Sequence, residues 1–131
     1  MEARLAELLG EPATEAVVVS PCHAGLAGLD PGDTPIARMI RAVQGHCGYL
    51  YLVSGVSRVA LFPFEGGSIR AVRGPALLEC PRDTIAHVAV QDHGLTRRVT
   101  LEFRDGHWLE LDVPRSQSGR LGRLVEHLAA A

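Results

Sequence analysis

The fold is decided by the stretch RRVTLEFRDGHWLELDV, residues Arg97 to Val113, in which apolar and polar residues alternate on both sides of an Asp-Gly turn. This alternation is typical of a two-stranded hairpin. A three-residue loop of residues 104–106, with Gly106 in the left-handed region as a bulge, gives one apolar and one polar face. A two-residue loop would set Leu101 opposite Glu110 and mix the faces, so we expect the longer loop.

This register sorts the side chains of the hairpin by polarity. Its polar side also places opposite charges across from each other, which stabilises a strand pair. The expected apolar pairs are Phe103 with His107, Leu101 with Leu109, and Val99 with Leu111. The expected polar pairs are Glu102 with Trp108, Thr100 with Glu110, and Arg98 with Asp112.

An amphipathic helix is predicted after Pro114. It begins near Ser116 or Ser118, whose hydroxyls can accept a hydrogen bond from an unpaired backbone N–H. Apolar residues then recur with a spacing that forms one helical stripe: Leu121, Leu124, Val125 and Leu128. Burying four such side chains contributes roughly 6–12 kcal/mol before entropy is subtracted. We therefore expect the helix to dock against the sheet.

Upstream of the hairpin, short apolar runs are separated by glycine-containing turns, which is typical of a β-meander. Pro63 cannot donate to a strand ladder, so we expect it at a sheet edge, a bulge or a strand end. A turn is expected at Asp92-His93-Gly94. The predicted strands are residues 49–53, 58–64, 68–72, 76–80 and 85–91.

The N-terminal part of the chain is predicted to contain a helix and one short strand. Residues 2–9 place Leu5, Leu8 and Leu9 on one helical stripe, with Gly10 as a stop signal. Residues 16–19 form a β-branched run that we expect to end at Pro21.

The segment from Cys22 to Gly48 is the least clear. Its first half is predicted to be a loop because it contains Gly25, Gly28, Pro31 and Gly32. In its second half, Thr34 and Pro35 favour a helix start, with Ile36, Met39, Ile40 and Val43 on one face. A strand with Ile36, Ile40 and Ala42 on one side is the alternative.

A meander, a final Asp-Gly hairpin and one C-terminal helix together resemble small bacterial proteins of the pleckstrin-homology-like (PH-like) superfold. The resemblance covers about residues 30–130 and rests on Asp30-Pro31-Gly32-Asp33, on Gly48 to Phe62, on Ile85 to Val90 and on Val99 to Val113. It implies an α+β, mostly β fold: curved antiparallel sheets of about six to seven strands, capped by the C-terminal helix. It implies no single function, since such scaffolds bind lipids, peptides and proteins.

Composition indicates one ordinary globular domain over residues 1–131, with a helical extension (1–12), a β-rich body (13–114) and a capping helix (115–130). The chain is 47% hydrophobic and 21% charged, with a net charge of -2. This balance does not favour nucleic acid or an anionic membrane. No apolar run approaches a membrane span, and three cysteines without a framework favour a cytoplasmic location.

Two cysteine–histidine neighbours, Cys22-His23 and His46-Cys47, form a set that can bind zinc. Adjacent residues of an extended strand point to opposite faces, so both members of a pair reach one metal only in a turn. We therefore expect no metal or other cofactor, and interpret Cys22 and Cys47 as small buried residues. A metal-dependent enzyme that uses these four residues remains an alternative.

Other candidate chemistry is weaker. Asp92-His93, Asp105-Gly106-His107 and Glu126-His127 should diverge in regular structure, whereas acid–base catalysis needs converging groups. Nucleophile and phosphate-loop motifs are missing. The arginines that a phosphoinositide site would need are widely spaced, so phospholipid binding is not predicted: Arg58, Arg70, Arg73 and Arg82.

The sequence thus favours a non-enzymatic interaction module that binds a partner protein or a second copy of itself. Trp108 falls on the polar face of the hairpin, and exposed aromatic residues are enriched at protein contacts. The stripe of Leu5, Leu8 and Leu9 also needs a partner surface, which on another copy would make a homodimer. The alternative is a domain that binds a small ligand or lipid near residues 22–48.

Overall fold

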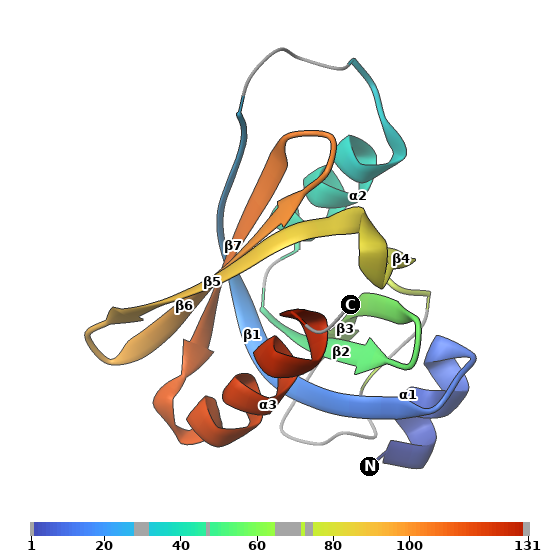
Figure 1. The fold of residues 1–131 in the computed structure, drawn as a ribbon, viewed down its shortest axis with the longest axis vertical. Helices are drawn as coiled ribbons and strands as arrows, with labels where there is room; N and C mark the ends of the chain where they lie inside the picture. The colour runs from blue at the N-terminus through green and yellow to red at the C-terminus, as the bar shows by residue number, and fades with distance from the viewer. Residues whose placement is uncertain (1, 28–31, 47, 65–71, 73–74, 130–131) are drawn as a thin grey trace.

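Strands dominate the computed structural model of the chain, which describes residues 2–27, 32–46, 48–64, 72 and 75–129 (Figure 1). Within these residues, seven antiparallel strands follow the order β4-β3-β2-β1-β7-β6-β5. The strands are β1 (Ala13–Leu26), β2 (Tyr49–Gly55), β3 (Arg58–Phe64), β4 (Leu78–Pro81), β5 (Ile85–His93), β6 (Thr96–Phe103) and β7 (His107–Pro114). The helices are α1 (Glu2–Leu9), α2 (Pro35–Gln44) and α3 (Ser118–Ala129), with short 3-10 turns at Arg82–Thr84 and Arg115–Gln117.

The final hairpin has the predicted register. Five of the six predicted pairs occur in the β6–β7 ladder. The sixth, Phe103 with His107 next to the loop, is not part of it. Gly106 has φ +97°, and its amide donates to the carbonyl of Phe103 at 3.0 Å. The three-residue loop is therefore confirmed, and with it the separation of the two faces.

The long strand β1 connects the two halves of the sheet. Its first half pairs with β2 as far as Val19, and its second half pairs with β7 from Ser20 onward. The expectations that Pro21 ends the strand and that the next residues form a loop were wrong. A proline is tolerated here because β1 changes partner at this point and a bulge follows directly, between Pro21 and Ala24.

The rest of the meander also agrees with the sequence, with two qualifications. Strand β5 continues to His93, so the turn lies at Gly94 and Leu95 rather than at 92–94. The strand predicted for 68–72 lies outside the described residues except for Val72, which bridges to Phe64. Pro63 lies near the end of β3, beyond the residues that pair with β4, as predicted.

All three predicted helices are present, and the helix alternative for 34–44 is the correct one. The Thr34 hydroxyl accepts a hydrogen bond from the amide of Ala37 at 3.1 Å, and Pro35 occupies the first turn of α2. Leu121, Leu124 and Leu128 of α3 are buried, so the apolar stripe of this helix is docked. No helix within the described residues is long and apolar enough to cross a membrane.

Two hydrophobic clusters lie on opposite faces of the β1–β3 layer. The larger cluster contains Leu50, Leu52 and Leu61 together with the apolar sides of α2, α3 and the β5–β7 layer. The smaller one contains Tyr51, Val53 and Phe62 of β2 and β3, covered by α1. The described chain is thus a mostly β, α+β structure with a C-terminal helix and a short N-terminal helix.

Candidate functional site

One edge of the sheet is long and has no strand partner in the described part of the chain. Strand β5 stands last in the strand order and, among the residues that the structure describes, pairs only with β6, over nearly its whole length. Strand β4, at the other end, spans only four residues and finishes at Pro81. An unpaired edge presents a row of backbone N–H and C=O groups that another strand can pair with.

The register of β5 determines which backbone groups face outward. His93 and Thr96 flank a two-residue turn and therefore form a hydrogen-bonded pair, and such pairs alternate along an antiparallel ladder. The amides of the intervening residues Val88, Val90 and Asp92 consequently point away from β6. These groups make β5 a template for strand addition.

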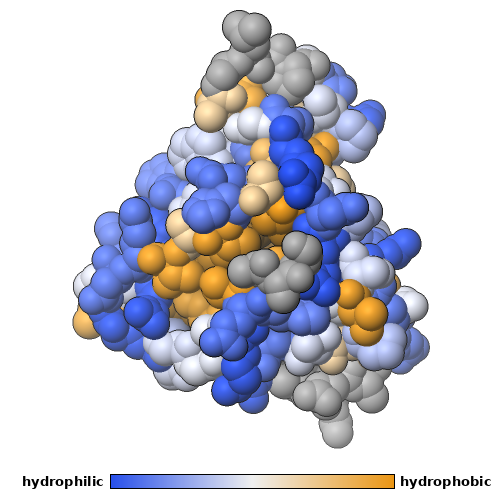
Figure 2. Space-filling model, viewed as in Figure 1, coloured by the Kyte–Doolittle hydropathy of each residue, from blue (hydrophilic) through white to orange (hydrophobic). Residues whose placement is uncertain are grey.

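The side chains beside this edge form an apolar hollow. Val88 and Val90 are half-buried and pack on the main core, as does Val125 of α3. A hollow of about 240 Å³ lies here, lined by Ile85, Ala86, His87, Val88 and Leu128, and at one end by Asp83 and Arg104. Figure 2 shows an apolar, recessed area on this face, where β5 runs past α3 in Figure 1.

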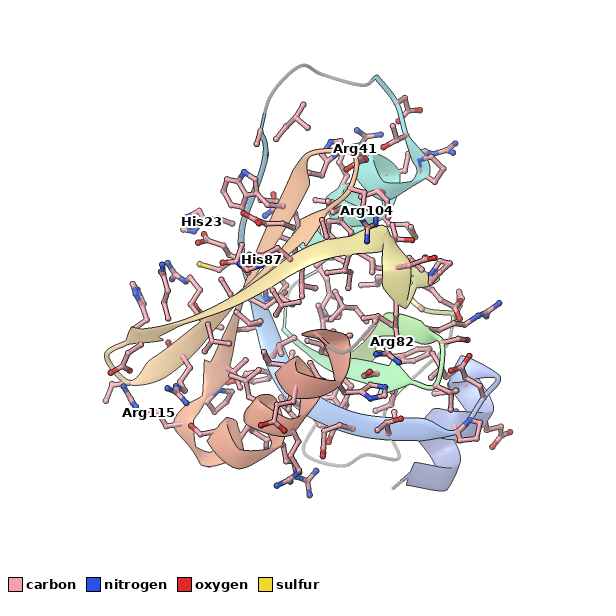
Figure 3. The ribbon with its side chains drawn as sticks, viewed as in Figure 1. His23, Arg41, Arg82, His87, Arg104 and Arg115 are labelled. Atoms are coloured by element: carbon pink, nitrogen blue, oxygen red, sulfur yellow. The ribbon has the colours of Figure 1, made fainter. Side chains whose placement is uncertain are left out.

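The charged groups at the end of this hollow balance each other. The Nε of Arg104 donates to the backbone carbonyl of Asp83, which holds the guanidinium beside the start of β5 (Figure 3). Asp83 and Arg104 carry opposite charges and both line the hollow. Together these two side chains add no net charge to this end of the hollow.

The N-terminal stripe finds its partner surface within the same chain. Leu5 and Leu9 are 0% and 1% exposed and belong to the cluster with Tyr51, Val53 and Phe62. Leu8 is half-buried against the same cluster. The assignment of these leucines to an intermolecular contact is therefore corrected, because the outer face of β2 and β3 already covers them.

Trp108 is half-buried rather than fully exposed. Its indole lies over Gly25, the residue that faces it across the β1–β7 ladder. A Cβ at position 25 would lie only 2.4 Å from the Cζ2 of this ring, so the close contact requires a glycine. Trp108 thus has an intramolecular contact, and its role in binding a partner stays a prediction.

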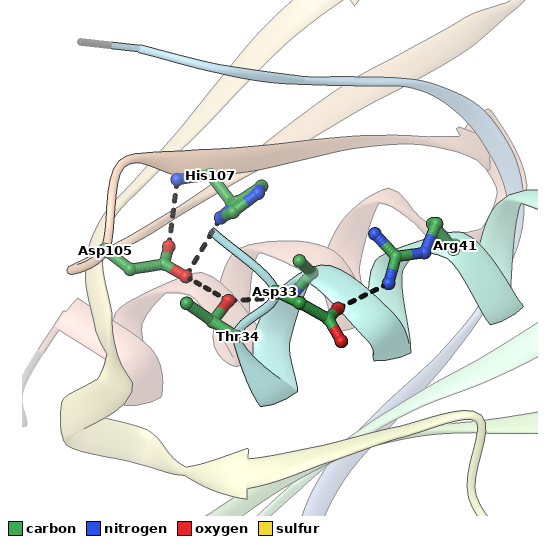
Figure 4. A network of polar contacts seen from close by, with 6 residues as sticks. Asp33, Thr34, Arg41, Asp105 and His107 are labelled. Atoms are coloured by element: carbon green, nitrogen blue, oxygen red, sulfur yellow. Dashed lines mark hydrogen bonds and ion pairs between the residues drawn. The ribbon is translucent and has the colours of Figure 1, made fainter. Parts of the chain in front are cut away.

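A polar network joins the tip of the last hairpin to the start of α2 (Figure 4). The Asp105 carboxylate accepts hydrogen bonds from the Thr34 hydroxyl at 3.0 Å, from the His107 amide at 2.9 Å and from the His107 ring Nδ1 at 2.9 Å. From the sequence we expected the side chains of Asp105 and His107 to point away from each other. They meet because the aspartate sits in the turn and its side chain folds back onto the next strand.

This network lowers the pKa of Asp105. Burial by itself would raise the pKa of the carboxyl group, but the hydrogen bonds from His107 and Thr34 stabilise the ionised form and outweigh burial. The carboxylate therefore links the hairpin tip to Thr34, whose hydroxyl also caps α2. We interpret this aspartate–histidine pair as structural.

We expect Asp105→Asn to lower the free energy of unfolding by about 1–3 kcal/mol at neutral pH, because the acceptor loses its charge and one of its two accepting oxygens. The wild-type contribution is present above the ordinary aspartate pKa of about 3.9 and disappears as the pH falls through the lower folded value. Urea unfolding measured from neutral to acidic pH should therefore show a smaller acid-induced loss in the variant.

Asp33→Asn is the matched control for this experiment. Asp33 makes an exposed ion pair with Arg41 at 2.7 Å (Figure 4), and exposed pairs of this kind contribute about 0–1 kcal/mol. A loss at Asp33 as large as that at Asp105, or an unchanged acid response in Asp105→Asn, would contradict the assigned role of the network.

The predicted zinc set is divided between two places. Cys22 and His23 lie next to each other in β1, with 3.0 Å between Sγ and Nδ1. The ring of His46 contacts the carbonyl of Tyr49 at 3.2 Å and does not join them. Cys47 lies outside the described residues. Cys22 is half-buried in polar surroundings, which corrects its assignment as a core residue.

The two described cysteines differ in environment. Burial raises the pKa of the Cys80 thiol to about 11, as for a packed, unreactive cysteine. Burial also raises the pKa of Cys22, and the nearby carboxylate of Asp112 raises it further. Sequence reasoning missed that Glu110 of β7 lies beside this pair, at 3.5 Å from the Nδ1 of His23.

The arginines considered for a phosphate site are engaged elsewhere. Arg58 forms an ion pair with Glu79 at 2.9 Å, and Arg82 donates to the carbonyls of Val56 and His127. Arg70 and Arg73 lie outside the described residues. Arg98 pairs with Asp112 at 3.0 Å, as the hairpin register predicted.

A second, more open hollow lies where the sequence suggested a small-ligand site. It is formed between α2 and the end of β1, with a volume of about 260 Å³. Its lining includes Ile40 and Arg41 of α2, Gly25 and Leu26 of β1, and His107 of β7.

Comparisons with known proteins do not assign the chain to a family. No protein-family model matches the chain, and no curated protein matches it.

Proposed function

We propose that this chain is a non-enzymatic, PH-like protein-interaction module that binds an extended segment of a partner protein along β5. The observation that carries the proposal is the nine-residue edge of β5, which has no strand partner among the described residues. Main-chain hydrogen bonds to such an edge supply affinity, and pockets for alternate side chains supply specificity.

The chemistry of the partner segment follows from the groups at this edge. Its backbone would pair with the outward amides and carbonyls of Val88, Val90 and Asp92. Its inward side chains would then lie beside the half-buried valines and enter the hollow next to Leu128 of α3. A segment with apolar residues at every second position meets both requirements, because successive side chains of a strand point to opposite faces.

The edge also lacks most of the features that discourage strand pairing; the acidic Asp92, which forms an ion pair with Arg115, is the exception near its end. Residues 85–93 contain no proline, lysine or arginine, and the bulge in β5 lies at its very start, between Ile85 and His87. Natural edge strands often use such residues or bulges to prevent pairing with other chains. Their absence from most of β5 supports a strand-binding role.

We expect Val88→Lys to weaken peptide binding at this edge at least about tenfold, because a charged side chain replaces an apolar one beside the hollow. The probe is a set of peptides selected from a random phage-displayed library on the full-length chain and then measured by calorimetry. A loss of affinity of at least about tenfold corresponds to 1.4 kcal/mol. In amide hydrogen exchange, the bound peptide should protect Val88, Val90 and Asp92.

Ala89→Lys is the matched control, since it adds the same charge to the neighbouring residue on the opposite face of the strand. Equal losses in the two variants would contradict the proposed site. Failure to select any peptide that protects the outward amides of β5 would contradict it as well. Selected ligands that perturb Arg41 and His107 instead would place binding at the hollow beside α2, as the small-ligand alternative requires.

A further inference from the structure

The bulge in β1 brings two neighbouring side chains to one partner residue. In the β1–β7 ladder, Pro21 faces Leu111 and Ala24 faces Leu109. The two residues between them on β1 therefore stand opposite a single residue of β7, Glu110. A bulge of this kind re-aims a side chain that regular pleating would send to the other face.

The result is a convergence of three different metal-binding groups. The Sγ of Cys22, the Nδ1 of His23 and a carboxylate oxygen of Glu110 all lie within 4.8 Å of one another. The Sγ–Nδ1 distance is 3.0 Å and the Nδ1–Oε1 distance is 3.5 Å. Zinc bonds of about 2.3 Å to sulfur and about 2.0 Å to nitrogen or oxygen, at tetrahedral angles, require ligand separations of this order.

We propose that Cys22, His23 and Glu110 bind a divalent transition metal ion of the zinc type. Sulfur and imidazole ligands favour zinc over magnesium and calcium, which prefer sites made of oxygen. Three protein ligands leave one position of a tetrahedral ion open, as in sites that bind an exchangeable water. His23 is 69% exposed at its side chain, so the ion can enter from solvent.

The surrounding charges are compatible with a bound cation. Asp112 follows Glu110 on the same face of β7 and lies beside the Cys22 thiol. The guanidinium of Arg98, which also acts on the Cys22 thiol, is held by Asp112 at 3.0 Å. This site is on the polar face of the β5–β7 layer, whereas the hollow of the proposed peptide site is on the core side of β5. The two proposals are therefore independent.

Cobalt(II) provides a direct test with the full-length chain. A cobalt–thiolate bond gives charge-transfer absorption in the near ultraviolet, and tetrahedral cobalt gives intense visible bands. We expect both to appear on titration and to be reversed by zinc(II). Trp108, the sole tryptophan, is two residues from Glu110 on the same face of β7, so its fluorescence should be quenched in parallel.

Variants of the ligands separate this site from other thiols and histidines. We expect Cys22→Ser to remove the charge-transfer band, and His23→Gln or Glu110→Gln to weaken cobalt binding by at least about tenfold. His93→Gln, at an exposed position of β5, is the matched control and should bind cobalt like the wild type. Circular dichroism will verify that each variant is folded.

Two results would overturn the proposal. One is the absence of a cobalt–thiolate band in the wild-type chain at equimolar metal. The other is a band and Trp108 quenching that persist in Cys22→Ser, which would assign the thiolate to another cysteine. Neither result would affect the peptide-binding test, which reads out Val88 on the core side of β5 and the outward amides of that strand.

Discussion

Replacing Leu9 by alanine is expected to lower the free energy of unfolding by about 2–5 kcal/mol without changing the oligomeric state of the protein. Leu9 is 1% exposed and packs with Leu5 against the outer face of β2 and β3. Truncation leaves a cavity in this cluster, because the strands beneath cannot move in to fill it. Urea denaturation gives the stability, and size exclusion with light scattering gives the mass.

The exposed Leu95 supplies the control for this prediction. It is 91% exposed in the β5–β6 turn, so Leu95→Ala should change stability by less than about 0.5 kcal/mol. If Leu9→Ala left stability unchanged but converted a dimer into monomers, the N-terminal stripe would be an intermolecular contact after all. That outcome would refute the packing of α1 described above.

Gly106→Ala is expected to destabilise the protein by about 2–5 kcal/mol. Its φ of +97° costs an L-residue roughly 1–2 kcal/mol, and crowding in a packed site costs roughly 1–3 kcal/mol more. The crowding arises because a Cβ at this position would lie 2.6 Å from the backbone carbonyl oxygen of Ala27. The amide of Ala27 donates to the carbonyl of Gly106 at 2.8 Å, so the two segments are held together there.

Gly94→Ala separates the two contributions. Gly94 also has a positive φ, of +67°, but a Cβ there would meet no atom of the described residues within 4 Å. Its replacement should therefore cost only the roughly 1–2 kcal/mol of the backbone conformation. Equal losses at both glycines, measured by urea denaturation, would show that the contact between the hairpin tip and Ala27 does not constrain the fold.

The parts of the fold that the sequence predicted best are those with strong local patterns. The β6–β7 register followed from the alternation of residues 97–113, because a slip of one residue would have buried charges. The apolar stripe of α3 was predicted equally well, whereas the Thr34 cap favoured a helix for α2 but left a strand as the alternative. The PH-like identity and the interaction function remain proposals, because local patterning is shared by many β folds with different functions.

Other features were hidden because they depend on contacts distant in sequence. The continuation of β1 through Pro21 to Leu26 needs β7 as a second partner, which lies about 90 residues further along the chain. One signal was present for the docking of α1: the run Tyr49 to Val53 is apolar at every position. Continuous apolar strands are typical of sheets buried on both faces, so a cover for the outer face was to be expected.

The candidate sites were also predicted only in part from the sequence. The sequence drew attention to Cys22 and His23 but not to Glu110, because adjacent residues converge on one partner only where a bulge interrupts the pleat. The open edge of β5 could not be predicted for a different reason. Ile85 to Gln91 could be identified as a strand, but its place at the end of the strand order is a property of the whole sheet.

The sequence by itself determined the β-rich class, the register of the last hairpin and the amphipathic helices near the two ends of the chain. Each of these follows from the period of apolar residues and from turn and cap chemistry within about twenty residues. Only the tertiary structure decided that β1 serves two partners, that α1 is covered by its own chain and which edge is open. These depend on long-range pairing, for which local sequence carries no direct signal.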